Sequence, residues 1–100
     1  MIIHTVVFRL KHAEGSAEEK AFMDRAKVLT AIPGVTNFQY RKQVSPKNNF
    51  TFGFSMEFES DADYQGYNEH PNHVDFVQNV WLPEVEEFME LDFERFIPAA

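Results

Sequence analysis

Residues 50–59 read FTFGFSMEFE, and this stretch carries the clearest structural pattern in the chain. Phenylalanine or methionine occupies every second position, and threonine, glycine, serine or glutamate stands between them. Alternation with a period of two is typical of a β-strand with one buried face. The pattern therefore predicts a strand over residues 50–59 that faces a core on one side and is polar or small on the other.

Three further strands are expected around this one. Ile2–Leu10 is rich in β-branched residues and is largely apolar on both faces, which is usual for a strand covered on both sides. Residues 35–44 are interpreted as a second strand, and the turn-forming sequence SPKNN at 45–49 places it next to residues 50–59 as an antiparallel hairpin. The last strand is predicted over residues 91–97.

Two helical regions are expected between the strands. Ser16 and Glu19 have the spacing of a capping box, and apolar residues at helical spacing follow until Pro33-Gly34 ends the helix. The second region begins at Ser60, with acidic residues in its first turn.

The second helical region is expected to be broken into pieces. A short helix runs to about Tyr67, another begins at Pro71 and extends through Val80, and Pro83 begins a third.

The resulting order is βαββαβ, which predicts the ferredoxin-like α+β class, a four-stranded antiparallel sheet with helices on one face. The apolar residues on the other face of the sheet then need a second partner. A homodimer whose sheets pack against each other is the simplest prediction.

Composition limits the classes of partner. One hundred residues, 44% of them hydrophobic, predict one globular domain over 1–100. The formal charge of −7 argues against nucleic acid and against an anionic membrane surface. The start, MIIHTVVFRL, lacks the features of a signal peptide. The absence of cysteine excludes disulfides, thiol catalysis and zinc–thiolate sites, and a cytoplasmic location is expected.

Several short motifs bring the sequence close to a known family. They are the β-branched first strand with its histidine and the segments IPGV at 32–35, VSP at 44–46, MEFES at 56–60 and HPNHV at 70–74. With these motifs the chain resembles the stress-responsive dimeric α/β-barrel domain, or Dabb, over nearly its whole length. The resemblance implies ferredoxin-like monomers that pair into a homodimeric α/β barrel.

The same resemblance implies candidate site residues. A plant polyketide cyclase of the family, olivetolic acid cyclase, uses the second histidine of the HPxH element as a base, with a tyrosine six residues earlier and a histidine on the first strand. The matching residues here are His73, Tyr67 and His4. The cyclase has a further pocket tyrosine on its first helix, where this sequence has Ala26.

Each candidate also has an ordinary structural interpretation. His73 falls in the first turn of a helix, where neutral imidazole, the form required of a general base, is favoured. The same position is equally suitable for a buried structural histidine whose ring is hydrogen-bonded to a backbone carbonyl. A histidine on an apolar strand face, such as His4, is typically a core residue with its hydrogen bonds satisfied. A tyrosine at a helix end, such as Tyr67, typically packs its ring and leaves its hydroxyl in contact with water.

No metal and no cofactor are expected. His70 and His73 are three residues apart, but His70 precedes the helix and is expected to cap it. Glu69 and Asp75 lie nearby without forming an aligned third ligand. The acidic run Glu84, Glu86, Glu87 and Glu90 is interpreted as a solvated face.

Three functional hypotheses remain. The first is a cofactor-independent enzyme of the polyketide cyclase or lyase kind, with a hydrophobic pocket for a small hydrophobic or aromatic ligand and His73 as general base. The second is a non-enzymatic dimer, related to stress or to ligand binding, in which the same residues are structural. The third is a monooxygenase, cofactor-free or haem-dependent, on the same fold.

Overall fold

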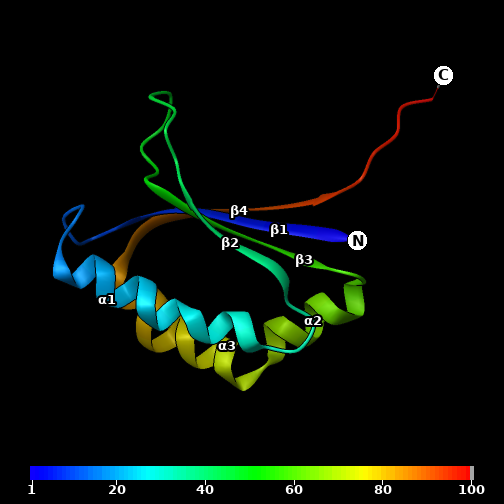
Figure 1. Ribbon diagram of the computed structural model, residues 1–100, viewed down its shortest axis with the longest axis horizontal. Coiled ribbons are helices and arrows are strands. Elements are labelled where there is room, and N and C mark those ends of the chain that lie inside the picture. Colours follow the sequence, from blue (N-terminus) through cyan, green and yellow to red (C-terminus); the bar gives the residue numbers. More distant parts are fainter. Residues whose placement is uncertain (100) are drawn as a thin grey trace.

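The computed structural model describes residues 1–99 and has four strands in one sheet with all helices on one side of it (Figure 1). The strands lie in the order β2-β3-β1-β4, and every neighbouring pair is antiparallel. This confirms the ferredoxin-like fold. The elements are β1 (Ile2–Leu10), α1 (Ala17–Arg25), the 3-10 helix η1 (Ala26–Ala31), β2 (Thr36–Lys42), β3 (Phe52–Phe58), α2 (Asp61–Glu69), α3 (Pro71–Phe76), the π-helix η2 (Val77–Trp81), α4 (Leu82–Glu84) and β4 (Val85–Glu94).

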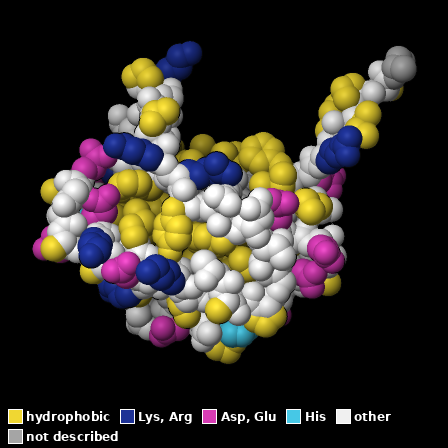
Figure 2. Space-filling view, viewed as in Figure 1, with side chains coloured by type: hydrophobic (Ala, Val, Ile, Leu, Met, Phe, Trp, Pro, Cys, Tyr) yellow, Lys and Arg dark blue, Asp and Glu magenta, His cyan; other side chains and the backbone are white. Residues whose placement is uncertain are grey.

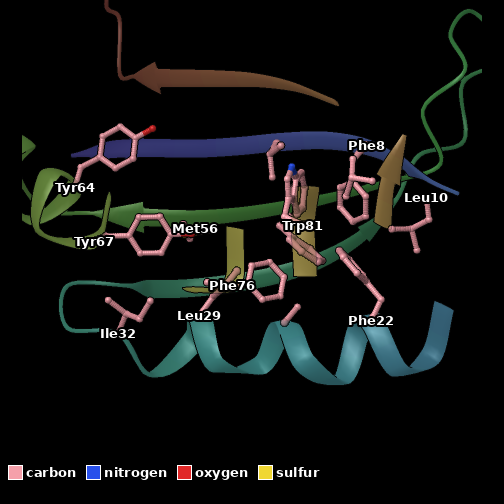
Figure 3. Packing of buried hydrophobic residues seen from close by; sticks show 14 of the residues in the cluster. Phe8, Leu10, Phe22, Leu29, Ile32, Met56, Tyr64, Tyr67, Phe76 and Trp81 are labelled. Atoms are coloured by element: carbon pink, nitrogen blue, oxygen red, sulfur yellow. The ribbon is translucent and has the colours of Figure 1, made fainter. Parts of the chain in front are cut away.

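Strand β3 has the buried face that its alternation predicts. It pairs with β1 in a register that places Met56 opposite His4 and Phe54 opposite Val6. Phe54, Met56 and Phe58 are almost fully buried. Side chains from β1 and β3 meet those of the helices in one aromatic core, which Figure 3 shows between the strands and α1.

The first helix begins where the capping residues predict. The Glu19 N–H donates to the Ser16 hydroxyl at 3.2 Å. The Glu19 carboxylate accepts from the N–H of Gly15 rather than from that of Ser16. After Arg25 the helix tightens into η1, and Gly34, with φ of 92°, turns the chain back toward the sheet.

The expectation that Pro83 begins a further helix is confirmed in part: Pro83 lies in the first turn of α4, but no break in the helical backbone precedes it. The backbone stays helical from α3 through η2 into α4, with αR angles at both junctions, Val77 and Leu82. Pro83 has no N–H to bond the preceding turn, and the Leu82 N–H bonds the carbonyl of Val77, five residues back. The break that the sequence predicts before Pro71 is present, because His70 is extended there.

The last strand begins earlier than its expected start at Leu91. Strand β4 covers Val85–Glu94 and pairs along the whole of β1, from Leu10 opposite Val85 to Ile2 opposite Glu94. The length of the central strand therefore sets the length of its edge neighbour. The strand ends at Glu94, so residues 95–97 of the expected strand lie outside it.

The acidic run is not one solvated face. Glu84 ends α4 and is mostly buried, with its carboxylate bound to Arg25 and His12. Glu86 and Glu87 are exposed and bind Arg9.

The face of the sheet that the helices leave open is rich in apolar side chains. Ile3 of β1 and Met89, Leu91 and Phe93 of β4 are between 37% and 52% exposed. Figure 2 shows hydrophobic surface in the upper middle of the view, between the β2–β3 loop and the C-terminal segment. Among residues 1–99, no helix has the length and hydrophobicity needed to cross a membrane.

Candidate functional site

A cavity of about 180 Å³ opens between the sheet and the second helical region. A dry cavity of about 150 Å³ is enough to hold benzene, so this one accommodates a small aromatic molecule. The wall is mostly apolar and includes all three candidates from the sequence. The lining residues are His4, Val6, Leu29, Phe54, Met56, Tyr67, His73, Phe76, Val77, Trp81, Leu82, Phe88 and Glu90.

His73 lies in the first turn of α3, where Pro71 begins the helix. Its Nδ1 atom is 3.1 Å from the carbonyl oxygen of Asn68, and because that oxygen only accepts, Nδ1 carries the hydrogen. Burial lowers the pKa of His73, and the hydrogen bond to the Asn68 carbonyl opposes that shift. The neutral ring therefore presents an unprotonated Nε2 as its second nitrogen.

Tyr67 lies on α2 with its ring 4.4 Å from that of His73 and 6.4 Å from that of His4. The residue is 2% exposed, and its hydroxyl has no hydrogen-bond partner within residues 1–99. Burial, followed by the charges of Tyr64 and Glu90, raises the pKa of Tyr67. The phenol therefore stays neutral and can donate a hydrogen bond to a molecule in the cavity.

His4 lies on β1 and is buried. Its Nδ1 atom is 2.6 Å from Oδ1 of Asp92 on β4. A carboxylate only accepts, so Nδ1 carries the hydrogen and Nε2 is the second nitrogen of the ring. In the part of the chain that the structure describes, Nε2 has no protein partner, and the ring lines the cavity. His4 and His73 thus meet at one cavity from different elements.

His70 is separate from this group. Its side chain accepts a hydrogen bond from the Asn72 N–H at 3.1 Å and caps α3, as the sequence predicts. His70 does not line the cavity. Among residues 1–99 there is no group of three or more His, Cys, Asp or Glu side chains that could hold a metal ion.

Two polar residues that sequence reasoning did not assign to the site hold His4 in place. The Tyr64 hydroxyl is 2.9 Å from Nδ1 of His4 and 3.0 Å from both carboxylate oxygens of Asp92. Burial and the hydrogen bond to Asp92 raise the pKa of Tyr64. The only available signal for Tyr64 was its position three residues before Tyr67, which places both on one side of a helix.

Glu90 is the third residue that sequence reasoning missed. It pairs opposite Val6, and Asp92 pairs opposite His4, so both carboxylates lie in the row of β4 that faces the helices. A correct start for β4 would have revealed this alternation. Glu90 is exposed and gives the mostly apolar cavity wall a carboxylate.

Comparison with protein families agrees with this architecture. Residues 2–95 match the stress-responsive A/B barrel domain, Dabb. The chain belongs to the Dabb family. A comparison with curated proteins gives no significant match.

Solved Dabb and ferredoxin-like structures share this fold. A Dabb family protein with a ferredoxin-like fold from Mesorhizobium loti is 55% identical, with a TM-score of 0.93, covering 95% of this chain and 96% of that one. The hydroxynitrile lyase of Passiflora edulis is 19% identical, with a TM-score of 0.82, covering 97% and 96%. A dimeric ferredoxin-like protein of unknown function from Thermobifida fusca is 18% identical, with a TM-score of 0.76, covering 92% and 88%. The last two show a shared fold only.

Within this Dabb chain, Ala26 does not take part in the site. It is fully buried in the core where α1 passes into η1, and it does not line the cavity. The polar groups at the cavity come from β1, α2, α3 and β4. The arrangement combines two imidazoles and a neutral phenol at a mostly apolar wall, which suits acid–base chemistry on a small uncharged group.

Proposed function

We propose that the cavity is a cofactor-independent active site of the polyketide cyclase or lyase kind, which moves a proton to or from carbon in a small hydrophobic carbonyl compound. One observation carries the proposal. Nε2 of His73, the hydroxyl of Tyr67 and Nε2 of His4 have no protein partner within residues 1–99, and all three residues line the same cavity. No fully buried side-chain nitrogen or oxygen in residues 1–99 lacks a hydrogen-bond partner, so these three atoms are open to the cavity, where a ligand can bond them.

His73 is the general base of this proposal. Its lowered pKa keeps Nε2 free of a proton near neutral pH, and Asn68 holds the ring through Nδ1. Nε2 takes a proton from the carbon beside the carbonyl, and the electron pair moves onto the carbonyl oxygen. The Tyr67 hydroxyl donates to that oxygen as it becomes negative. His4, held by Asp92 through Nδ1, lines the same cavity and contacts the developing enolate together with Tyr67.

The cavity volume favours a compact substrate. About 180 Å³ holds one aromatic ring with a short side chain. A small arylalkyl aldehyde or ketone, with a hydrogen on the carbon beside the carbonyl, is therefore the proposed substrate class. The Passiflora edulis neighbour is a hydroxynitrile lyase, which is consistent with lyase chemistry on this fold and assigns no reaction to this chain.

Deuterium exchange tests the chemistry directly. Phenylacetone in D₂O exchanges the protons beside its carbonyl, and NMR follows the rate with and without protein. We expect acceleration by the native protein and its loss in His73→Asn, whose amide keeps a donor for the Asn68 carbonyl but lacks Nε2. His70→Asn is the matched control, because asparagine also caps helices. It should retain the rate.

The non-enzymatic alternative predicts a different outcome. A protein that binds phenylacetone without accelerating exchange would contradict the enzyme and favour a ligand-binding dimer. Loss of exchange in both histidine variants would also contradict the role of His73, because His70 does not line the cavity.

The proposal includes a homodimer formed through the open face of the sheet. The exposed apolar residues of β1 and β4 lie in one row of the register, since Ile3 pairs with Phe93 and Thr5 with Leu91. The Thermobifida fusca neighbour, described as dimeric, supports this arrangement. A cytoplasmic location also belongs to the proposal and is supported by the lack of cysteine in the chain.

A further inference from the structure

The wall of the cavity contains a carboxylate that the proposed proton transfer does not use. Glu90 lies on β4 opposite Val6 and lines the cavity. Within residues 1–99 it forms no hydrogen bond and no ion pair, whereas Glu84, Glu86 and Glu87 all bind basic side chains. An acidic side chain without a basic partner at a ligand-sized cavity is available to a ligand.

The charge of Glu90 affects the pKa values of two other residues that line the cavity. After burial, it is among the causes that raise the pKa of Tyr67, and it opposes the lowering of the pKa of His73 by burial. The groups facing Glu90 from the neighbouring elements are therefore a neutral phenol and a neutral imidazole. Glu90 is exposed to solvent, and neither of these groups supplies a positive charge to it.

Aromatic rings line the same cavity as this carboxylate. Phe88 precedes Glu90 by two residues in the same row of β4, and its ring meets that of Trp81 edge to face at 5.5 Å. Phe76 and Phe54 line the same wall. The faces of aromatic rings attract cations, and indole does so most strongly. A cavity that is lined by one carboxylate and several rings suits a small organic cation.

We propose that the cavity selects a small aromatic or branched aliphatic compound that carries a protonated amine, seated with its ammonium group against Glu90. The inference rests on the proposed function in one respect, that both place the substrate in this cavity. It narrows the substrate class to amine-bearing compounds. It also excludes carboxylic acids of the same size, because their charge would meet that of Glu90.

Three probes of one shape test the preference. Benzylamine, benzyl alcohol and benzoate differ mainly in charge, and NMR titration of the ¹⁵N-labelled protein gives a Kd for each. We expect benzylamine to bind about tenfold tighter than benzyl alcohol, combining one exposed ion pair with cation–π contact. Benzoate should bind more weakly than either. Equal affinities for benzylamine and benzyl alcohol, or no binding of any probe, would overturn the inference.

The variant Glu90→Gln tests whether the preference for benzylamine over benzyl alcohol depends on the Glu90 carboxylate. The variant should bind benzylamine and benzyl alcohol about equally while its affinity for the alcohol stays near the native value. Glu94→Gln is the matched control for the overall negative charge, because Glu94 lies on the same strand outside this cavity. It should keep the native ratio. The role of Glu90 would be contradicted if Glu90→Gln kept the native ratio of benzylamine to benzyl alcohol affinity. It would also be contradicted if both variants lost that ratio equally.

The two proposals fail independently. Exchange on phenylacetone needs His73 and involves no amine, whereas the affinity ratio involves no reaction. An amine preference in a protein without exchange would overturn the proposed chemistry and support this inference. Exchange in a protein without an amine preference would support the proposed chemistry and overturn this inference.

Discussion

Nδ1 of His4 and Oδ1 of Asp92 lie 2.6 Å apart across the β1–β4 pair, where the two residues are direct partners in the register. The Tyr64 hydroxyl reaches both residues from α2. A strand at the edge of the sheet thereby fixes which nitrogen of a buried imidazole carries hydrogen. The other nitrogen is left for the cavity, so the sheet register and the chemistry of the site depend on each other.

Asp92→Asn should change the hydrogen placement of His4 with little change in shape. An amide can turn its N–H₂ toward Nδ1, which then accepts and leaves the hydrogen on Nε2. We expect the ¹⁵N shifts of His4 to move from the Nδ1–H to the Nε2–H form. Tyr64→Phe is the companion variant, because its ring still stacks on Phe58 at 5.0 Å. Unchanged ¹⁵N shifts in Asp92→Asn would contradict the assignment.

The pH dependence of stability should reveal the burial of His73. Its pKa in the folded protein lies below the ordinary value of 6.5. The unfolded chain therefore binds more protons as pH falls through about 6.5, and the free energy of unfolding decreases in that direction. The same lowered pKa keeps the proposed base active in mildly acidic solution.

NMR and urea unfolding measure these two effects. The His73 Cε1–H resonance should titrate with a midpoint below 6.5. The decline in unfolding free energy between about pH 7 and pH 5 should be shallower in His73→Asn than in the native protein. A His73 midpoint above 6.5 would show that the ring is not buried as described.

The proposed dimer predicts that one charge on the open sheet face changes the assembly. Leu91 lies opposite Thr5 on that face and is 37% exposed, so Leu91→Arg would place a buried, unpaired charge in the interface. Sedimentation at micromolar concentration should show a dimer for the native protein and a monomer for the variant. Val28→Arg on η1, a similarly exposed position on the helix side, should remain dimeric. A monomeric native protein would exclude this interface.

The sequence predicts most of the fold because its strongest local patterns agree with the tertiary structure. The alternation over residues 50–59 locates β3, Ser16 locates the start of α1, and Pro71 locates the start of α3. Strand β4 was misplaced because four glutamates obscure its alternation. Its position follows from pairing with the whole of β1, which no local window contains.

Some residues of the candidate site could also be predicted from the sequence, and others could not. His4, Tyr67 and His73 were predicted from a motif and from resemblance, and the structure brings all three to one cavity. Tyr64 and Asp92 were missed because their relation to His4 depends on how α2 and β4 dock onto β1. Spacing along the chain carries no information about a contact between residues 4 and 92.

Tyr67→Phe separates the proposed chemistry from packing. Phenylalanine retains the ring that lies 4.4 Å from His73 and 5.2 Å from Phe58, and it removes only a hydroxyl that has no partner within residues 1–99. The free energy of unfolding should therefore change by less than about 1 kcal/mol, since no protein hydrogen bond is lost.

The rate should respond differently from the stability. Removing one donor to a developing oxyanion typically costs about 10²–10³ in kcat, so we expect phenylacetone exchange to fall by about that factor in Tyr67→Phe. Urea unfolding and exchange by NMR on the same preparation provide the two numbers. A variant as active as the native protein would remove Tyr67 from the mechanism. If the fall in rate, expressed as a free energy, equals the loss in unfolding free energy, the Tyr67 hydroxyl supports the fold and not the reaction.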